Sequence, residues 1–387
     1  MTGTFVLSGT SVFDGASFHH GYGLLITDGT IDGFDLLENL PTDCSHVKVS
    51  GGLLAPGFND LQVNGGGGVL FNEQPTVAAI ETICRAHLRF GTTGLLPTLI
   101  TDTPEITSRA IEAGKQATQK QVPGFLGLHL EGPHLSRGKK GAHDPELIRQ
   151  MTDEDCDQLI AAKDQLPHLM VTVAPESVSN QQISRLAEAS IIVSLGHSAA
   201  TLEEAKAARQ AGASCITHLY NAMSPLTHRE PGMVGAGLAP LGYYCGLIAD
   251  GYHVDPDVIA ISLAAKRGAG SIFLVSDAMS TIGTDIKRFE LNGRMIHRKE
   301  GRLTLADGTL AGADLELGSA VRYLVNEVGV ELEEALRMAS AYPQDCLRGT
   351  EKPALLVEGA QADVIHLDSG LRVQEVWQQG NATLGEQ

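Results

Sequence analysis

The sequence predicts an α/β fold, a (β/α)8 barrel of the TIM type that carries a small β-sandwich-like domain. From about Gly57 onward, eight short apolar runs alternate with stretches whose apolar residues have helical spacing. The runs are residues 57–63, 93–99, 124–130, 168–174, 191–197, 214–219, 244–250 and 271–277. Segments such as 153–163, 180–189, 201–212 and 255–270 lie between them and begin with the polar residues typical of helix N-termini. Eight strands that alternate with helices favour a closed barrel.

The two ends of the chain have a different pattern. Residues 1–55 and 354–380 show short alternating strands separated by Gly and Asp turns, so we expect 1–55 and 346–387 to form one small β domain beside a barrel of residues 56–345. Within the barrel, 286–312 has the pattern of hairpins and 316–348 that of helices. The alternative is an open doubly wound sheet, but the glycine run 65–68 does not match the G-x-G-x-x-G fingerprint of that fold.

Composition excludes several classes of protein. The net charge of −18 argues against nucleic acid or an anionic membrane as a partner, although a local positive pocket can still bind a phosphorylated small molecule. No apolar run is long enough to span a bilayer, and the N-terminus lacks the pattern of a secretory signal. The six cysteines show no C-x-x-C spacing, which argues against a thiolate zinc site and fits a reducing, cytoplasmic location.

Ionisable side chains follow several of the predicted strands at the end where a barrel builds its active site. They are Asp60 with Gln62 and Asn64, Glu131, His197, His218, Asp250 with His253, and Asp277. One carboxylate and two imidazoles suit Zn²⁺, Fe²⁺ or Co²⁺. Asp277 is then placed to take a proton from water and return it to a leaving group. Any one of these histidines alone is more often a core histidine, and Asp277 could be a helix N-cap, but their coincidence at one rim favours a site.

Seven segments in barrel order carry a resemblance to a known family. They are LAPGFNDLQVNGGGG (54–68), GTTGLLPTL (91–99), LHLEGPH with KKGAHD (128–144), SLGHS (194–198), THLYNAMSPLTHREPGMVG (217–235), LIADGYHVD (247–255) and LVSDAMS (274–280). The chain resembles the amidohydrolase superfamily, and within it the N-acetylglucosamine-6-phosphate deacetylases. The resemblance implies a metal-dependent hydrolase that releases acetate from N-acetyl-D-glucosamine 6-phosphate and leaves D-glucosamine 6-phosphate.

The resemblance also implies roles for individual residues. It makes Glu131, His197 and His218 the ligands of one divalent metal per subunit, with zinc first and iron or cobalt as alternatives. Asp277 becomes the acid/base, and Ala142 and His143 face the substrate, with His143 near the amide carbonyl. The sugar phosphate is expected at Asn221, Ala222, Arg229 and His253, and the acetyl end under Leu310, Ala311 and Gly312. A homodimer is expected, in which Arg229 or its neighbours serve the phosphate across the interface.

One departure from the superfamily pattern is informative. Where many amidohydrolases carry H-x-H after the first strand, this chain has Gln62-Val63-Asn64. Neutral amides are poor ligands for Zn²⁺, so we predict one metal rather than two. His129 shares the strand parity of Glu131 and is expected to face the barrel interior behind it. His134 could be either a ligand or a polar loop residue. The loop cations Arg137, Lys139 and Lys140 could form either a solvated face or a contact with the substrate.

Three other functions stay open from sequence alone. The first is a deacetylase for the C4 epimer, N-acetylgalactosamine 6-phosphate. The two substrates differ only in the orientation of the C4 hydroxyl, which is recognised by details of the pocket that a sequence does not show. The second is a cyclic-amide hydrolase of the same superfamily, against which the missing H-x-H counts. The third is a non-catalytic barrel, against which the joint presence of Glu131, His197, His218 and Asp277 counts.

Overall fold

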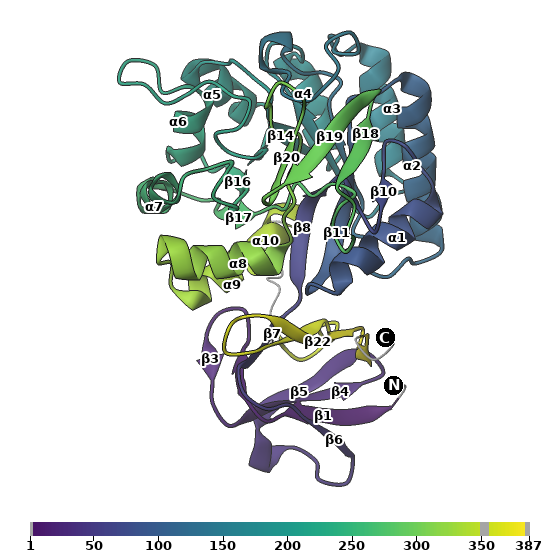
Figure 1. The fold of residues 1–387 in the computed structure, drawn as a ribbon, viewed down its shortest axis with the longest axis vertical. Helices are drawn as coiled ribbons and strands as arrows, with labels where there is room; N and C mark the ends of the chain where they lie inside the picture. The colour runs from purple at the N-terminus through teal and green to yellow at the C-terminus, as the bar shows by residue number, and fades with distance from the viewer. Residues whose placement is uncertain (1–2, 349–355, 384–387) are drawn as a thin grey trace.

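The structure is a computed structural model that describes residues 3–348 and 356–383. Within these residues one sheet has eight parallel strands in the order β17-β16-β15-β14-β13-β12-β11-β8. Its strands are β8 (Phe58–Val63), β11 (Thr92–Ile100), β12 (Leu128–Glu131), β13 (Leu169–Val173), β14 (Ile192–Leu195), β15 (Cys215–Ile216), β16 (Tyr244–Leu247) and β17 (Ile272–Leu274). Each coincides with one of the eight predicted runs, so the barrel prediction is confirmed (Figure 1).

Helices follow the strands and cover the outside of the sheet. They are α1 (Val77–Leu88), α2 (Pro104–Gln119), α3 (Asp153–Lys163), α4 (Asn180–Glu188), α5 (Leu202–Gln210), α6 (Gly232–Leu238) and α7 (Pro256–Ala265), followed by α8 (Leu317–Tyr323), the π-helical segment η3 (Leu324–Val328), α9 (Leu332–Ala339) and α10 (Ala341–Arg348). Several of these helices begin at a side-chain N-cap. Thr152, Ser179 and Thr201 each cap a helix and share a reciprocal capping box with the residue three positions later.

The barrel closes between its first and last strands, β8 and β17, through contacts just beyond the strand ends. The Asp277 amide donates to the Gln62 carbonyl at 3.0 Å, and Val63 bridges Ala278 in parallel. The Ser276 amide donates to the buried Asp60 carboxylate, with N–O distances of 3.2 Å. This seam therefore fixes where Gln62 and Asp277 lie relative to each other, although 215 residues separate them in the chain.

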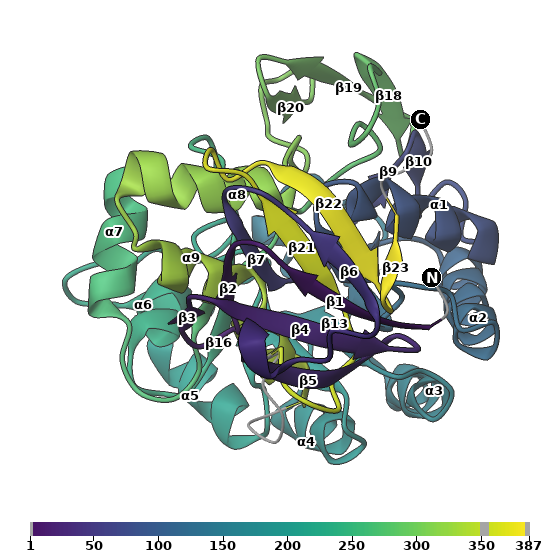
Figure 2. The ribbon, with the colours of Figure 1, turned by 90° about the horizontal axis from the view of Figure 1, so that it is seen from below.

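Two further sheets are formed by the ends of the chain, and the second of them combines strands from both ends. One is β5-β4-β1-β6, formed by β1 (Thr4–Ser8), β4 (Tyr22–Thr27), β5 (Thr30–Leu36) and β6 (Ser45–Lys48), with η1 (Leu37–Asn39) between the last two. The other is β23-β22-β21-β7-β2-β3, formed by β2 (Ser11–Phe13), β3 (Phe18–His19), β7 (Leu53–Pro56), β21 (Val364–Leu367), β22 (Val373–Gln378) and β23 (Asn381–Ala382). Seen from below, the C-terminal strands lie beside the N-terminal ones (Figure 2).

The terminal sheets enclose their own apolar core. Phe5, Leu24, Ile26, Leu54 and Trp377 are buried in it, apart from the main cluster around the barrel strands. The domain limits at 55/56 and 345/346 stay a prediction; the second lies inside α10, and residues 349–355 and 384–387 of the predicted C-terminal part lie outside the described residues. Among the described residues, no helix has the length and apolar character to cross a bilayer.

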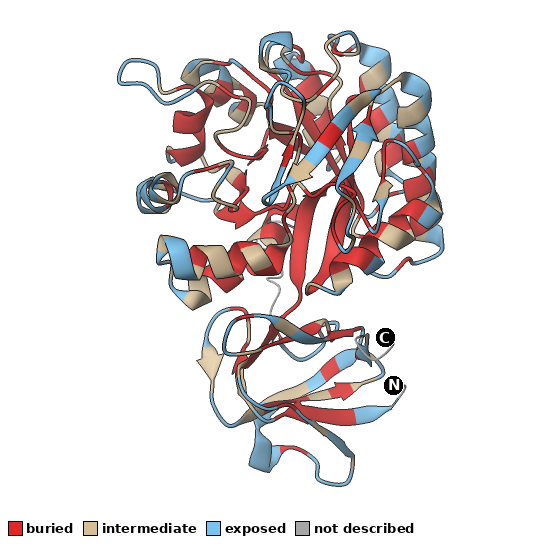
Figure 3. Cartoon of the chain, viewed as in Figure 1, coloured by how far each residue is buried: buried red, intermediate tan, exposed pale blue. Residues whose placement is uncertain are grey.

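A three-stranded flap lies at the open end of the barrel. It consists of β18 (Arg288–Leu291), β19 (Arg294–Lys299) and β20 (Arg302–Thr304), as the hairpin pattern of 286–312 predicts. Leu291, Ile296 and Leu303 pack with barrel residues Ile100 and Met279 in a small separate core. Figure 3 shows this partly exposed flap in front of the buried barrel strands. The shorter elements β9 (Gly65–Gly66), β10 (Val69–Leu70) and η2 (Arg137–Lys139) belong to loops at the same end.

Candidate active site

A cavity of about 500 Å³ opens at the strand ends beneath the flap. Its size suits a small ligand such as a sugar phosphate. All the predicted site residues line it except Arg229 and Ala311. Ala311 is fully buried in the small core of the flap, and Arg229 lies exposed on the loop between β15 and α6. Residues that sequence reasoning did not foresee, such as Ile100, Ile248, Leu291 and Thr309, complete the walls.

The ionisable residues reach the cavity through sharp backbone turns. His197, His218 and Asp277 have φ values of 47°, 31° and 51°, and Tyr220 and Ala222 are also left-handed. Such a conformation costs a non-glycine residue of order 1–3 kcal/mol, and it persists where the surrounding structure imposes it. The turns direct these side chains from the strand ends into the cavity mouth.

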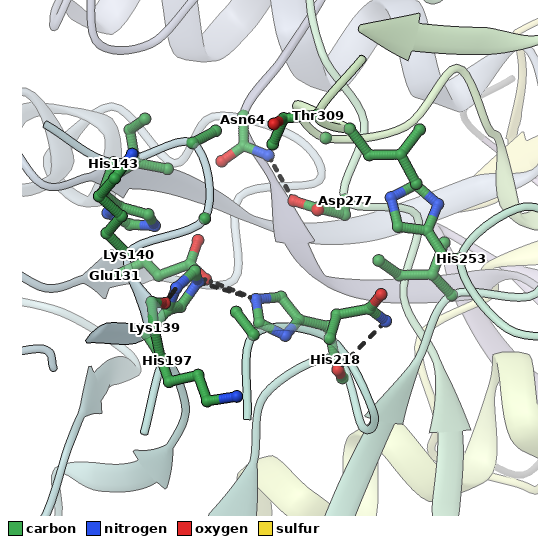
Figure 4. A pocket seen from close by; sticks show the side chains of 18 of the residues that line it. Asn64, Glu131, Lys139, Lys140, His143, His197, His218, His253, Asp277 and Thr309 are labelled. Carbon is green, nitrogen blue, oxygen red and sulfur yellow. Dashed lines mark hydrogen bonds and ion pairs between the residues drawn. The ribbon is translucent and has the colours of Figure 1, made fainter. Parts of the chain in front are cut away.

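Three donor atoms of the predicted metal ligands face one another. Oε1 of Glu131 lies 3.1 Å from Nε2 of His197 and 3.0 Å from Nε2 of His218, and the two Nε2 atoms lie 3.1 Å apart (Figure 4). Bonds of about 2.0–2.2 Å in a tetrahedral zinc site give donor separations of roughly 3.3–3.6 Å, so the three atoms are close to the spacing of a metal site. The residues present therefore fit the cation that the sequence predicts.

The pKa shifts of Glu131 and His218 also support a bound cation. Burial alone raises the pKa of Glu131, but hydrogen bonds from His197 and His218 outweigh it and hold that pKa well below its ordinary value. Burial likewise lowers the pKa of His218, and the Glu131 carboxylate more than reverses this and raises it. The carboxylate thus requires positive charge from its neighbours. Two protons cannot both lie between Nε2 atoms 3.1 Å apart, whereas one cation can serve all three donors.

A second triplet, Glu131, His143 and His197, also has its potential ligand atoms within 4.8 Å of one another. Hydrogen bonds decide between His143 and His218. The backbone N–H of Thr101 donates to Nδ1 of His143 at 3.3 Å, and the Thr101 hydroxyl lies 2.8 Å from the same nitrogen. A nitrogen that accepts an N–H carries no proton, so in the neutral ring Nε2 carries it and cannot bind a metal. We therefore favour His218 as the third ligand.

The state of the His143 ring follows from its surroundings. Burial and the neighbouring His197 keep the pKa of His143 well below its ordinary value, so the ring is neutral. His197 has the opposite tautomer, because its Nδ1 donates to the carbonyl of Lys139 at 2.8 Å and leaves the Nε2 lone pair free. The side chain of Arg294 reaches from the flap to the Ala142 carbonyl and fixes the loop that carries His143. Thr101 and Arg294 escaped sequence reasoning, because no local pattern marks either one.

The amide of Gln62 bridges the two carboxylates, and the amide of Asn64 contacts one of them. Nε2 of Gln62 lies 3.3 Å from each oxygen of Glu131 and 3.2 Å from Oδ1 of Asp277, and Nδ2 of Asn64 donates to the same Oδ1 at 2.7 Å. Burial and the negative charge of Glu131 raise the pKa of Asp277 to about 6, against the lowering effect of the Asn64 bond. The amides thus present N–H donors where H-x-H proteins present metal ligands.

Two glycines allow the backbone to approach the site closely. A Cβ on Gly312 would lie 2.6 Å from Met279 and 2.9 Å from the Asp277 carbonyl oxygen. A Cβ on Gly141 would lie 3.1 Å from the His197 ring. Both glycines have positive φ, so any other residue there would be strained as well as crowded.

At the opposite wall of the cavity, His253 forms an ion pair with Asp250. Nδ1 of His253 lies 2.7 Å from Oδ2 of Asp250, and both groups are buried. Burial alone would raise the pKa of Asp250, but the hydrogen bond with His253 outweighs that effect and holds the pKa below its ordinary value. The Asp250 carboxylate therefore stays charged. His134, in contrast, is not part of this cavity: its Nδ1 contacts the Arg149 carbonyl at 3.2 Å, and it lines a separate crevice between α2 and α3.

Sequence and structure comparisons agree with this geometry. A model described as the amidohydrolase family matches residues 53–383. The chain belongs to the amidohydrolase family. Among its relatives in this family is an N-acetylgalactosamine-6-phosphate deacetylase from Shewanella sp. (strain ANA-3), 43% identical over 91% of this chain and 89% of that protein. The N-acetylglucosamine-6-phosphate deacetylase of Haemophilus influenzae is 37% identical over 83% of this chain and 84% of that protein.

Solved structures of the family share the whole architecture. The N-acetylglucosamine-6-phosphate deacetylase from Pasteurella multocida superposes with a TM-score of 0.93 at 34% identity, covering 98% of this chain and 99% of that one. An aspartate-to-alanine variant of the Mycobacterium smegmatis enzyme, in complex with N-acetyl-D-glucosamine 6-phosphate, gives a TM-score of 0.89 at 28% identity over 98% and 99% of the two chains. These matches confirm the family resemblance that the sequence motifs indicate.

Proposed function

We propose that this chain hydrolyses N-acetyl-D-glucosamine 6-phosphate to D-glucosamine 6-phosphate and acetate. The observation that carries the proposal is the juxtaposition of the Glu131–His197–His218 donors with the buried acid Asp277 in one sugar-sized cavity. The names of relatives that match most of the chain support the same reaction. The family resemblance gives each residue its role, and the geometry is compatible with those roles.

Glu131, His197 and His218 would hold one divalent cation, with zinc favoured and iron or cobalt as alternatives. When bound, such an ion supplies Lewis-acid chemistry: it lowers the pKa of a water molecule and polarises a carbonyl. Gln62 and Asn64 offer amide N–H groups rather than imidazoles, so we propose a single ion per chain. Metal analysis of an active preparation tests this number, and two tightly held ions per chain would contradict it.

The chain's own residues supply the proton transfers. The Asp277 carboxylate accepts a proton from the attacking water as oxygen bonds to the amide carbon. It then returns that proton to the amide nitrogen as the carbon–nitrogen bond breaks, so acetate and the free amine leave. His143 presents a neutral Nε2–H to the amide oxygen, on which negative charge develops. A pKa of about 6 suits Asp277 for both directions of transfer near neutral pH.

The phosphate end of the substrate is proposed to lie at Asn221, Ala222 and His253, and the acetyl end under Leu310 and Gly312, with Ala311 buried in the flap core between them. Arg229 is exposed and lies outside the cavity of its own chain, so its predicted phosphate contact requires a second subunit. We therefore propose a homodimer in which Arg229 reaches the partner's cavity. Arg229→Ala should raise KM for the phosphorylated sugar, and an unchanged KM would remove Arg229 from the phosphate site.

Apolar exposure near this loop supports the dimer. Leu226 on the same loop is 55% exposed, and Ile261 on the strongly apolar helix α7 is 64% exposed. A helix that is apolar on most sides is usually covered, and a second copy of this chain would cover it. Light scattering of the wild-type chain and of an Ile261→Asp variant would test this surface. The six free thiols agree with the cytoplasmic location that we propose.

The C4 epimer is the second candidate substrate, because a 43%-identical relative is an N-acetylgalactosamine-6-phosphate deacetylase. Acetate release should be measured with both phosphorylated epimers and with unphosphorylated N-acetylglucosamine, with Zn²⁺, Fe²⁺ or Co²⁺ supplied. Fast release from the glucosamine derivative supports the proposal, and preference for the epimer keeps the mechanism but changes the substrate. With metal bound, no release from any of the three would overturn the deacetylase proposal in favour of another amide, such as a cyclic one.

A further inference from the structure

Of the described residues that are expected at the phosphate end of the cavity, Asn221 and Ala222 carry no charge. Nδ1 of His253 lies 2.7 Å from the Asp250 carboxylate, which offsets any positive charge on that ring. Arg229 lies outside the cavity. The carboxylates of Glu131 and Asp277 and the net charge of −18 add a repulsive field for a phosphate dianion. A phosphate needs a cationic contact here.

The backbone of Lys139 is held between the metal ligands and the proposed phosphate donors. Its carbonyl accepts the Nδ1–H of His197 at 2.8 Å, and its amide donates to the Ser136 carbonyl at 2.9 Å. Two residues later, a Cβ built on Gly141 would lie 3.1 Å from the His197 ring and 3.8 Å from Cβ of Ala222. This loop therefore lies against both ends of the site.

The side chain of Lys139 differs from its two cationic neighbours. It is half-buried and lines the cavity, and in Figure 4 it runs past His197 on the side of the pocket where His218 lies. Arg137 is exposed and directs its guanidinium at the Ile148 carbonyl, and Lys140 is exposed and acts electrostatically on Asp307. Among the residues that the structure describes, Lys139 has no carboxylate partner.

We infer that Lys139 is the cation by which this subunit itself contacts the substrate's phosphate, and that it sets the preference for phosphorylated over unphosphorylated amino sugars. The inference rests on the proposed function. Lys139 complements the partner's Arg229 rather than replacing it, because an ammonium on a half-buried stem can neutralise a phosphate that His253 and Asp250 together leave uncompensated.

Lys139→Met tests the inference, because methionine keeps the length of the side chain and the backbone bond to His197. We expect KM for the phosphorylated sugar to rise ~10–100-fold with kcat little changed, the loss of one charged hydrogen bond. The kcat/KM for unphosphorylated N-acetylglucosamine should stay within about twofold. Lys139→Arg should restore most of the affinity. Lys120→Met, which removes the same charge from an exposed site at the end of α2, is the matched control and should behave as wild type.

Three results would overturn the inference. They are an unchanged KM, an equal loss on both sugars, and a loss of the same size in Lys140→Met. The second would mean that the substitution disturbs His197, and the third that the loop acts only through its diffuse field. Calorimetric binding of inorganic phosphate separates this inference from the proposed reaction, because it needs no turnover. The Kd for phosphate should rise ~10-fold or more in Lys139→Met, and equal values in the variant and the wild type would refute the contact even if the wild type hydrolyses neither sugar.

Discussion

Two buried polar clusters lie within a few residues of each other in this barrel, and they differ in how their hydrogen bonds are satisfied. The first, which we name the interior chain, comprises Ser194, Thr217, Thr172 and His129 inside the barrel. The second, the rim cluster, comprises Glu131, His197, His218, Asp277, Gln62 and Asn64 at its mouth. Most members of both clusters are buried and Asp277 is partly buried, so burial alone does not distinguish a functional site from a structural one.

The interior chain runs in one direction. Nδ1 of His129 lies 3.0 Å from the Leu61 carbonyl, which can only accept, so Nδ1 carries the proton. Nε2 of His129 then accepts from Thr172 at 2.7 Å, Thr172 from Thr217 at 2.6 Å, and Thr217 from Ser194 at 2.6 Å. Burial lowers the pKa of His129 to about 4, so its ring is neutral. Each of these side chains has a hydrogen-bond partner, so the interior chain needs no ligand.

The rim cluster cannot be satisfied in the same way. Three donor atoms of Glu131, His197 and His218 face one another at 3.0–3.1 Å, and Asp277 keeps a second carboxylate near them. A polar network that lacks charge balance and a complete set of partners stabilises the fold poorly, and it suits an external cation and substrate. Crowded ionisable groups without a complete set of partners, rather than burial, therefore distinguish the functional site.

The largest expected effect is on catalysis at the rim. Asp277→Asn removes the group that accepts and returns the proton, so kcat for acetate release should fall by about 10²–10⁴ or more. Metal content and melting temperature should stay near wild type, because Asp277 is not among the proposed ligands. Acetate release and metal content should be measured on the same preparation. Full activity in the variant would contradict the assignment of Asp277 as the acid/base.

Removing the metal should affect stability as well as activity. Dialysis against a chelator should abolish acetate release and lower the melting temperature, because a ligand that binds only the folded state stabilises it. His218→Ala should reproduce both losses and bind less zinc, whereas His143→Ala should still bind zinc but turn over slowly. If His143→Ala loses the metal and His218→Ala keeps it, our choice of the third ligand is wrong.

A structural histidine should make the fold sensitive to acid. His87 is buried in α1 and donates Nε2–H to the Gly65 carbonyl at 2.9 Å, and burial lowers its pKa to about 4. The unfolded chain, with a histidine pKa of about 6.5, binds more protons between these values, so stability falls as pH drops from about 6.5 to 4. The loss from this residue amounts to about 3 kcal/mol. His87→Gln, which can keep the bond to Gly65, should flatten that part of the stability profile in chemical denaturation.

The smallest expected effect tests the interior chain. Thr217→Val leaves the hydroxyl of Ser194 without its acceptor and Thr172 without its donor, so the free energy of unfolding should fall by about 1–3 kcal/mol. Acetate release by the folded protein should stay within a few-fold of wild type. A hundredfold loss of kcat with normal stability would show that the interior chain takes part in catalysis, and the distinction between the two clusters would fail.

The strands, the helix starts and the residue types at the rim could be predicted from the sequence alone. Apolar runs, helical spacing and caps such as Thr152 and Ser179 are properties of neighbouring residues, so they can be read locally. Glu131, His197, His218 and Asp277 were found because a barrel brings all its strand ends to one face. The Gln62–Asn64 pair could be recognised as a departure from the H-x-H pattern. The bridge that the Gln62 amide forms between Glu131 and Asp277 could not be predicted.

Features that depend on contacts between distant segments could not be predicted from the sequence. The Thr101 hydrogen bond sets the His143 tautomer, the closing seam brings Gln62 to Asp277, and Arg294 of the flap holds Ala142. The tertiary structure also separated Arg229, outside the cavity, from Lys139, at its wall. A sequence specifies which groups are available, but proton positions and charge pairing depend on distances of about 3 Å between residues that only the folded chain brings together.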